Sequence, residues 1–438
     1  MDQRRSAIRV IVASLIGTSL EWYDFFLYGS AAALVFGKLF FPTFDPLTGT
    51  LLALTTYAVG FVARPLGGIV FGHYGDRIGR KSVLVVTLVL MGVATTLIGV
   101  LPTYAAIGAA APILLVTLRF VQGIGLGGEW GGAVLMSIEH ADPARRGFTA
   151  SWPQVGVPAG NLLASAVLWL LSAVLSDDAF LSWGWRVPFL LSGILVVVGL
   201  WIRVSVEESP LFASVERTGT KVRMPLVEVL RRHPRGLLVA MGARIGTDVA
   251  FYTFVVYVLT YVTGTVGLPR EVGLVAVLVG SACQLGLIPL FGAMSDRYGR
   301  RPVYLAGTVA AAAWVFAFFP LLDTGSRPLI ILAVTGALIT HAAMYGPQAA
   351  LIAELFATEL RYSGASMGYQ VAGILGGAPA PIIAIQLVEW TGSATAVSWY
   401  VLAMLAITAV ALLAAPETAH RPLDPEPAAP PAGARTVA

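Results

Sequence analysis

The sequence predicts an all-α integral membrane protein with twelve transmembrane helices, arranged as two six-helix halves with both termini cytoplasmic. Three observations support this prediction. Of the 438 residues, 57% are hydrophobic and only 12% are charged, whereas soluble proteins average about 25% charged residues. Twelve apolar stretches are long enough to cross a bilayer, which takes about 20 residues. A charged loop that contains glycine occurs twice, once in each half.

The apolar stretches are too long for barrel strands and lack a two-residue alternation, so we expect helices. The predicted spans are residues 9–36, 50–71, 82–101, 112–136, 148–175, 187–204, 237–263, 271–292, 303–322, 328–353, 365–388 and 396–415. Arg4, Arg5 and Arg9 precede the first span, as in a secretory signal. The apolar run contains acids, however, and it continues to Phe36, which is longer than a signal core. We therefore expect a retained first helix.

Lysine and arginine are divided unevenly between alternate loops. Of the 28, 21 fall on one side, four fall on the other, and Arg64, Arg119 and Arg244 lie within spans. Because basic loops remain in the cytoplasm, we expect both termini there and the protein in the plasma membrane. The basic residues occupy short loops and not one face, so the pI near 9.2 does not indicate nucleic-acid binding.

The chain divides into four predicted parts. These are an N-terminal half at 1–204, a basic cytoplasmic linker at 205–236, a C-terminal half at 237–415 and a tail at 416–438. The tail is rich in Pro and Ala and is expected to be disordered. Residues 225–233 form either a short amphipathic helix on the anionic inner leaflet or a solvated linker. Cys283 is the only cysteine, so no disulfide within the chain is possible.

The repeated loop reads Gly72-His-Tyr-Gly-Asp76-Arg77-Ile-Gly79-Arg80-Lys81, and Gly292-Ala-Met-Ser-Asp296-Arg297-Tyr-Gly299-Arg300-Arg301 begins 220 residues later. Its charges cannot enter hydrocarbon, so each copy is expected at a membrane surface. Asp76 and Asp296 would pair with arginines or cap the next helix, in contacts that break as the halves move. Exposed pairs contribute about 0–1 kcal/mol, which suits a reversible latch. The predicted latch residues are Gly72, Asp76, Arg77, Gly79, Arg80, Glu139, Arg145, Asp296, Arg297, Gly299, Arg300, Glu354 and Arg361.

The first span carries two acids, although a charge at the bilayer centre costs about 2.5–3.5 kcal/mol. Glu21 and Asp24 are three residues apart and Asp24 and Tyr28 are four apart, so each pair shares a helix face. Two acids this close in a poorly hydrated cavity would not both stay ionised, which favours a proton carrier. A structural acid paired with an arginine is the alternative. We expect Trp22 and Tyr28 to contact the solute.

The fourth span adds Arg119, Gln122 and Glu129. Gln122 and Glu129 are seven residues apart on a common face, and Arg119 lies one turn before Gln122. Arg119 either holds a substrate carboxylate through its fork of donors or neutralises a buried acid such as Asp24 or Glu129. Both interpretations remain open. We predict that Glu21, Asp24 and Glu129 couple transport to protons.

The second half carries a matching set of polar residues. Arg244, Asp248 and Tyr252 are spaced by four, so they form either a local ion pair or part of the substrate site. His341 titrates near neutrality and belongs either to a proton relay or to the packed interior. Arg64 is expected to extend toward the cytoplasm from its apolar stem.

Six motifs together resemble one known family. They are Glu21-Trp-Tyr-Asp24-Phe-x-Leu-Tyr28-Gly, Ala-Arg64-Pro-Leu-Gly-Gly, Arg119-x-x-Gln122-Gly-x-x-x-Gly-Gly-Glu129-Trp-Gly-Gly, Trp183-Gly-Trp-Arg186-x-Pro-Phe, Glu207-Glu-Ser-Pro210-x-Phe and Glu359-x-Arg361-Tyr-Ser-Gly364. With the doubled loop, they resemble the metabolite:proton symporter branch of the major facilitator superfamily. This resemblance implies a substrate site between the two halves and proton-driven uptake of solutes such as shikimate, α-ketoglutarate, citrate, proline and glycine betaine.

The leading hypothesis is therefore symport of a small carboxylate-bearing solute with protons. A proton-independent facilitator or an exporter of the same fold is the alternative. The five histidines have no metal-site spacing, and no nucleotide-binding motif is present, which argues against an enzyme or an ATP-driven pump. We expect no cofactor or metal, and as partners only the solute, protons and the lipid bilayer. A monomer is expected.

Overall fold

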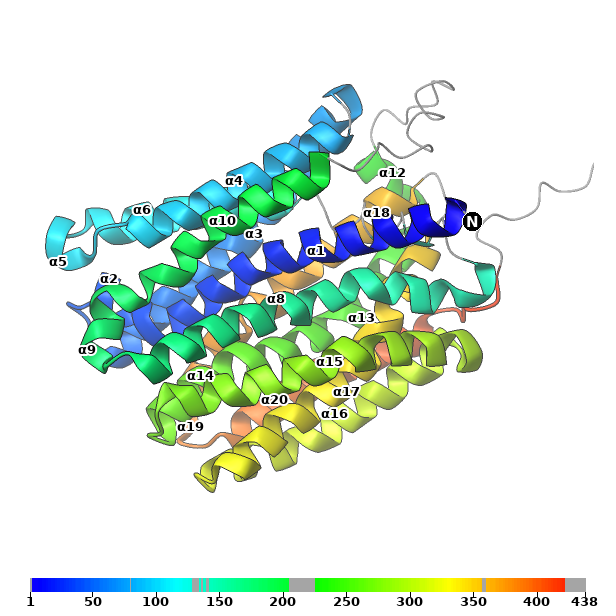
Figure 1. The fold of residues 1–438 in the computed structure, drawn as a ribbon. Helices are drawn as coiled ribbons and strands as arrows, with labels where there is room; N and C mark the ends of the chain where they lie inside the picture. The colour runs from blue at the N-terminus through cyan, green and yellow to red at the C-terminus, as the bar shows by residue number, and fades with distance from the viewer. Residues whose placement is uncertain are drawn as a thin grey trace, which may run out of the picture.

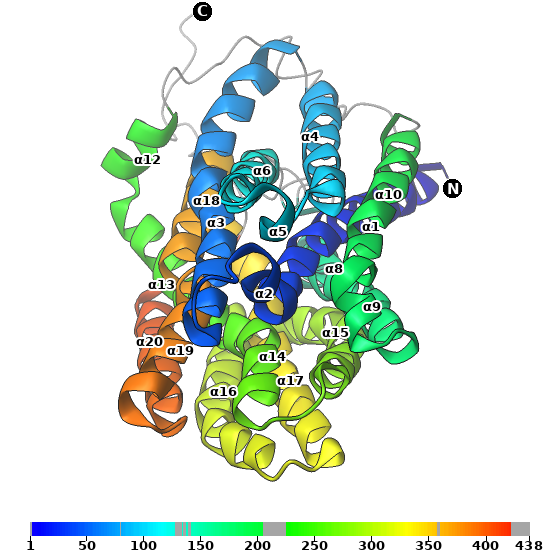
Figure 2. The same cartoon turned by 90° about the vertical axis from the view of Figure 1, so that its left-hand side faces the viewer.

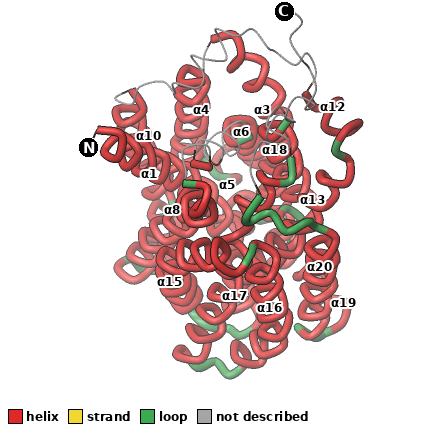
Figure 3. The backbone as a smooth tube through the Cα atoms, turned by 90° about the vertical axis from the view of Figure 1, so that its right-hand side faces the viewer, coloured by secondary structure: helices red, strands yellow, loops and turns green. Residues whose placement is uncertain are grey.

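The computed structural model describes residues 2–78, 80–127, 134, 137–138, 142–204, 225–356 and 360–421. Within these ranges the side chains of 2–14, 69, 72–84, 143, 202–204, 225–227 and 362 are left out of the description. Every regular element in the described ranges is a helix, and Figure 3 shows helices joined by loops. The prediction of an all-α chain is confirmed.

The first 204 residues contain the following helices. They are α1 (Asp2–Ala31), which continues through the π-helical η1 (Ala32–Phe36) into α2 (Gly37–Phe40), α3 (Pro46–Ile78), α4 (Arg80–Val100), α5 (Tyr104–Ile107), α6 (Ala110–Leu126), η2 (Pro143–Arg145), α8 (Arg146–Val174), α9 (Asp177–Ala179), η3 (Phe180–Gly184) and α10 (Arg186–Val204).

The second part of the chain begins with the short α12 (Pro225–Arg232). It continues with α13 (Pro234–Tyr252), η4 (Thr253–Tyr257), α14 (Val258–Thr260), η5 (Tyr261–Thr265), α15 (Arg270–Tyr298), α16 (Arg300–Asp323), α17 (Arg327–Glu354), α18 (Arg361–Ala372), η6 (Gly373–Gly377), α19 (Ala380–Thr391) and α20 (Thr395–Ala414).

Each of the twelve predicted spans overlaps one of these helices. By length and composition, eight helices of the described chain can cross a membrane, and the bent pair Asp177–Gly184 and Arg186–Trp201 makes a ninth. Two shorter apolar helices, Val85–Val100 and Ala110–Leu126, fall below that length. A multi-span membrane protein is confirmed, and the count of twelve stays a prediction.

The long helices run side by side as a bundle (Figure 1). The N-terminus and the last described residues lie at one end, and the short helices α5 and α9 lie at the other (Figures 1 and 2). Helix α8 packs against α1 on one side and α15 on the other, and α17 packs against α8, α15 and α16. Helices from the first and second parts of the chain therefore meet along α8 and α15.

The bundle exposes large apolar side chains and buries several charged ones. Large apolar side chains such as those of Ile194 and Val410 are 62% and 67% exposed, whereas Arg119 and Arg244 are 1% and 2% exposed. Exposed apolar surface of this extent suits lipid contact. The buried charges face other helices, as expected for ionisable groups in a membrane protein.

Helix α3, which carries Arg64, packs closely on α6, which carries Arg119. A Cβ atom added at Gly123 would overlap the carbonyl oxygen of Gly60, and one at Gly127 would overlap that of Arg64. Small residues allow helix backbones to approach this closely in membranes. The contact places Arg64 of α3 beside the helix that carries Arg119.

Candidate functional site

Helix α1 directs its predicted acids into the bundle. Glu21 and Asp24 are 3% and 4% exposed. The hydroxyl group of Ser192, on α10, donates a hydrogen bond of 2.5 Å to Oδ1 of Asp24. One turn further, the hydroxyl group of Tyr28 lies 2.7 Å from Oγ1 of Thr56. The sequence missed Ser192, because a serine inside an apolar span carries no signal of its own.

Arg119 of α6 is buried among aromatic rings of α1 and α3. Its Cζ atom is 4.5 Å from the ring centroid of Phe25, 4.4 Å from that of Tyr28 and 4.8 Å from that of Tyr57. Its Nη1 donates to Oε1 of Gln122 at 3.1 Å, and its Nε makes a longer contact of 3.4 Å with the carbonyl oxygen of Tyr57. Aromatic faces attract cations, so these rings hold the guanidinium group in place.

Gln122 continues this arrangement toward α4. Its Nε2 atom donates to Oγ1 of Thr95 at 2.6 Å. The predicted pairing of Arg119 and Gln122 on one face is therefore present as a direct hydrogen bond. Because Gln122 is bonded on both sides, its amide group fixes the position of Arg119.

No carboxylate oxygen of a described residue lies within 4.0 Å of the Arg119 guanidinium group. Asp24 bonds to Ser192 instead. Glu129, the other candidate partner, lies outside the described residues. These contacts are compatible with both predicted roles of Arg119, a ligand of the substrate carboxylate and a counter-charge for a buried acid.

Arg64 does not extend to a surface, contrary to expectation. It is 2% exposed, and its Cζ atom lies 4.3 Å from the ring centroid of Phe25 and 4.4 Å from that of Phe61. A third ring, that of Trp22, is 5.5 Å away. Helix α3 continues to Ile78, so Arg64 lies well inside it, and the three rings provide the cation–π contacts that keep it there.

Helix α13, in the second part of the chain, holds a buried ion pair. Nε of Arg244 is 2.8 Å from Oδ2 of Asp248 on the same helix, and both side chains are buried. The Arg244 guanidinium group also lies 3.0 Å from the ring centroid of Tyr369 on α18. The local ion pair predicted from the four-residue spacing is present, and Tyr369 is a contact that the sequence did not indicate.

His341 lies among aromatic and amide groups. Its Nδ1 atom is 2.9 Å from Nε2 of Gln284 on α15. Its ring stacks on Tyr345 at 5.0 Å and lies 4.6 Å from Phe251. A carboxylate within ion-pair distance of His341 is absent from the described part of the chain. These contacts suit the packed interpretation of His341 as well as a relay.

Tyr252 joins the two groups of residues. Its ring lies 5.3 Å from Phe61, 6.2 Å from Tyr57 and 6.4 Å from Phe25, measured between centroids. Gly377, at the end of η6, approaches both Tyr252 and Phe61 so closely that an added Cβ atom would lie 2.6 Å from the first ring and 3.1 Å from the second. The predicted site residues of α1, α6 and α13 thus gather around one aromatic cluster inside the bundle.

The end of the bundle that carries the second loop copy holds an ionic network. Arg300 Nη1 lies 2.7 Å from Asp296 Oδ1, and its Nη2 lies 3.2 Å from Glu354 Oε1. Asp296 also accepts the backbone N–H groups of Gly147 and Phe148 at 2.7 and 2.8 Å. These groups open α8, so the carboxylate occupies a helix N-terminus, where negative charge is favoured.

Arg146 joins this network, although the sequence pointed to its neighbour. Nη1 of Arg146 lies 3.6 Å from Oε1 of Glu354, whereas Arg145 is exposed. Helix α8 begins at Arg146, so this side chain turns inward. Arg297 is exposed beside Tyr298, and Nε of Arg361 donates to the carbonyl oxygen of Phe356 at 3.2 Å.

Glu417 contacts the same end of the bundle, which the sequence did not indicate. Its carboxylate accepts the backbone N–H groups of Arg300 at 2.9 Å and Arg301 at 3.0 Å, at the start of α16, and also those of Thr418 and Ala419. Burial alone would raise the pKa of Glu417, but these four donors lower it below its usual value. Residues 416–421, the start of the segment expected as a disordered tail, are therefore ordered against α16, and 422–438 lie outside the described residues.

Gly299 permits this contact. Its φ angle is +100°, and a Cβ atom there would lie 2.7 Å from Oε2 of Glu417. Only glycine adopts such a backbone conformation readily. Gly79 of the first loop copy, with Glu139, lies outside the described residues, and Gly72, Asp76, Arg77 and Arg80 belong to helices whose side chains there are not described.

Polar contacts also join the two parts of the chain at the opposite end. Arg270 Nη2 lies 2.8 Å from Asp177 Oδ1, and its Nε donates to Ser172 Oγ at 2.9 Å. Nearer the middle, Nδ2 of Asn161 on α8 donates to Oγ of Ser281 on α15 at 2.9 Å. The parts are thus in contact at both ends of the bundle.

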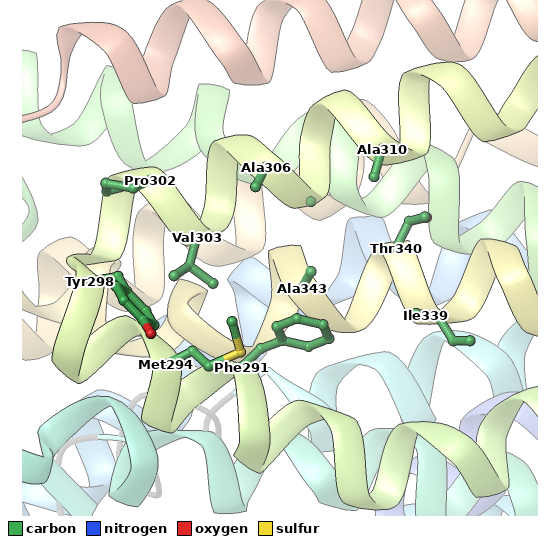
Figure 4. Close-up of a pocket in the computed structure, with 11 residues that line it drawn as sticks. Phe291, Met294, Tyr298, Pro302, Val303, Ala306, Ala310, Ile339, Thr340 and Ala343 are labelled. Atoms are coloured by element: carbon green, nitrogen blue, oxygen red, sulfur yellow. The ribbon is translucent and has the colours of Figure 1, made fainter.

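An apolar groove of about 390 Å³ lies apart from the charged cluster. Figure 4 shows it between α15, α16 and α17, with Phe291, Met294 and Tyr298 on one side and Ile339 and Ala343 on another. No charged side chain lines it. It therefore lacks the groups that bind a polar solute.

Known proteins resemble the chain over nearly its whole length. The "Inner membrane metabolite transport protein YhjE" of Escherichia coli K12 is 44% identical over 420 residues, covering 95% of each chain. The "Shikimate transporter" of the same organism is 44% identical over 412 residues, which is 93% of this chain and 94% of that protein. The "Proline/betaine transporter" of Salmonella typhimurium LT2 is 33% identical over 424 residues, or 95% and 84%.

Solved structures agree with the fold. The crystal structure of the D-xylose-proton symporter has a TM-score of 0.73 and 19% identity, and the match covers 94% of this chain and 99% of that one. The family model of the Major Facilitator Superfamily matches residues 11–361 and, in an overlapping match, 251–436. The chain therefore belongs to the Major Facilitator Superfamily and is a multi-pass transporter of the plasma membrane, not an enzyme.

Proposed function

We propose that this protein takes up a small carboxylate-bearing solute together with protons. The candidates are organic acids of the shikimate, α-ketoglutarate or citrate type and osmolytes such as proline or glycine betaine. The names of two relatives, a shikimate transporter and a proline/betaine transporter, support the shikimate and the proline or betaine candidates. The buried ionisable groups of α1 and α6 support symport.

One observation carries the proposal. The Arg119 guanidinium group lies on the ring of Tyr28, and Tyr28 is one helical turn from the buried carboxyl group of Asp24. A group that can bind a proton therefore lies beside a cation that can bind a carboxylate. Loss of the proton would leave a negative charge near Arg119 that competes with the solute anion, which couples the two ligands.

We further infer that twelve spans form two halves, 1–204 and 237–415, which rock about the aromatic cluster, and that both termini are cytoplasmic. Three observations support this inference: the doubled loop, the bias of basic residues to one side, and the polar contacts at both ends of the bundle. Asp296, Arg300, Glu354, Arg146 and Glu417 would form the cytoplasmic latch. Solute binding would involve Trp22, Tyr28, Arg119, Gln122, Arg244, Asp248, Tyr252 and His341.

The test uses the full chain in proteoliposomes loaded with buffer at pH 7.5 and diluted into buffer at pH 6.0. Accumulation of a radiolabelled solute above the external concentration is expected, and a protonophore should abolish it. Uptake that only equilibrates and ignores the protonophore would refute symport and favour a facilitator.

A further inference from the structure

Arg64 and Arg119 share an unusual environment. Both are buried, and no carboxylate oxygen of any described residue lies within 4.0 Å of either guanidinium group. Nε and Nη2 of Arg64 and Nη2 of Arg119 are buried and have no hydrogen-bond partner in the described part of the chain. Among the described residues, the interior therefore holds two guanidinium groups whose donors are incompletely satisfied.

Two other arginines have close polar partners, although Nη1 of Arg244 also has no hydrogen-bond partner in the described part of the chain. Arg244 bonds to Asp248, and Nη1 of Arg186 donates to the carbonyl oxygens of Gly99 at 3.0 Å and Leu101 at 2.7 Å. Burying an ion without an ion-pair partner costs more free energy than a cation–π contact returns. The aromatic rings thus offset only part of the cost at Arg64 and Arg119.

Both guanidinium groups lie against the same aromatic ring. Their Cζ atoms lie 4.3 and 4.5 Å from the centroid of the same ring, that of Phe25. The separation of the two Cζ atoms therefore cannot exceed the sum of these distances. A carboxylate has two oxygens and about four lone-pair directions, so it can accept donors from both side chains.

We propose that Arg64 and Arg119 jointly bind the anionic group of the solute and restrict the protein to organic anions, excluding betaine-type zwitterions. This inference rests on the transport function proposed above and narrows its solute class. Arg64 becomes a substrate-contacting residue, a role that its sequence context did not indicate.

The aromatic rings explain the exclusion of betaines. Quaternary ammonium groups bind to the faces of aromatic rings. Here the guanidinium group of Arg64 already lies against Trp22, Phe25 and Phe61. The guanidinium group of Arg119 already lies against Tyr28 and Tyr57. In glycine betaine one methylene separates the carboxylate from the ammonium group. A betaine held by its carboxylate would therefore place a third positive charge, that of its ammonium group, beside the two arginines.

Binding to the purified full-length protein tests the proposal without a proton gradient. The probes are shikimate, α-ketoglutarate and citrate, each compared with its methyl ester, together with glycine betaine and proline. We expect at least one acid to bind about tenfold more tightly than its ester, a difference of about 1.4 kcal/mol, and neither zwitterion to displace it. Tight binding of a zwitterion, or binding by none of the acids, would overturn the proposal.

Substitutions of Arg64 test whether this residue causes the preference for the acid over its methyl ester. We expect Arg64→Gln to lower the preference for acid over ester to about twofold or less, and Arg64→Lys to give an intermediate value because the charge remains without the fork. Arg186→Gln is the matched control and should leave the preference unchanged, since Arg186 bonds to backbone carbonyl oxygens and its ring contact is with Trp185, not with a ring around Arg64 or Arg119. An unchanged preference in a folded Arg64→Gln protein would show a structural role. The acid–ester comparison in the unaltered protein decides the solute class even if that variant does not fold.

Transport and binding together distinguish failure of the anion site at Arg64 and Arg119 from failure of proton coupling. Protonophore-insensitive uptake of an organic anion would remove proton coupling and leave the anion site in place. Proton-driven uptake of glycine betaine, with no competition from organic acids, would retain symport and refute the anion site.

Discussion

Oδ1 of Asp296 accepts a hydrogen bond of 2.7 Å from the backbone N–H of Gly147, although the two residues are 149 positions apart. The bond connects the C-terminal end of α15 to the first turn of α8. The same carboxylate is held by Arg300 at 2.7 Å. One acid of the repeated loop therefore links the first part of the chain to the second.

Substitution of Asp296 by Asn should weaken this end of the bundle. Asparagine keeps the size but loses the charge that favours a helix N-terminus, a loss of about 0.3–2 kcal/mol. Spin labels at the exposed positions Arg145 and Arg297, in a protein whose Cys283 is replaced by Ser, report the distance between the two segments. We expect the distribution to shift toward longer distances. Asp178→Asn, an exposed acid elsewhere, is the control and should leave the distribution unchanged.

Glu417→Gln should lower thermal stability at neutral pH. The folded pKa of Glu417 lies below its unfolded value, so its contribution is complete above about pH 4.3, the unfolded pKa, and disappears as the pH falls through the folded pKa. The difference in Tm between the original protein and the variant should thus be present at pH 7 and absent at low pH. Glu389→Gln, at an exposed site, should show no such difference. A difference in Tm between the original protein and Glu417→Gln that stays constant with pH would contradict this role for the ionised carboxylate.

Asp24→Asn should abolish concentrative uptake while solute exchange across the membrane continues. Asparagine can still accept the hydrogen bond of Ser192 but cannot carry a proton. Counterflow of labelled solute, compared with uptake driven by an imposed pH gradient, separates the two activities. Asp323→Asn, whose carboxylate accepts the hydroxyl group of Tyr261 at 2.6 Å, serves as the control and should keep both. Full accumulation by Asp24→Asn would exclude Asp24 from proton coupling.

Arg119→Lys should weaken the binding of carboxylates. Lysine keeps the charge but lacks the planar fork, and it would also lose the hydrogen bond to Gln122. We expect the Kd of the best organic acid to rise about tenfold, or about 1.4 kcal/mol, with little change for its methyl ester. Isothermal titration measures both values. Equal affinity for the acid in the two proteins would return Arg119 to a structural role.

Local patterns predicted the helices and much of the candidate site. The spacing of Arg244 and Asp248 made their ion pair one of two predicted alternatives, because four residues make about one turn of a helix, and the structure contains the pair. The same rule places Arg119 next to Gln122. Both contacts lie within a single helix, so no knowledge of neighbouring helices is needed.

Contacts between helices could not be predicted in this way. Glu417 reaches the N-terminus of α16 across 117 positions, and Ser192 reaches Asp24 across 168. The inward turn of Arg146, and not Arg145, depends on where α8 begins. Each of these contacts is set by the rotation and offset of packed helices, which no local pattern records.

By itself the sequence determined that this chain crosses a membrane as helices, since backbone N–H and C=O groups in lipid must bond within their own segment. It also determined that buried charges exist, because Asp24, Arg64 and Arg119 interrupt apolar runs. Only the tertiary structure decided which charges are matched. Arg244 finds its partner on its own helix, but Arg64 and Arg119 both lie against rings of α1, a contact that depends on how α1, α3 and α6 pack.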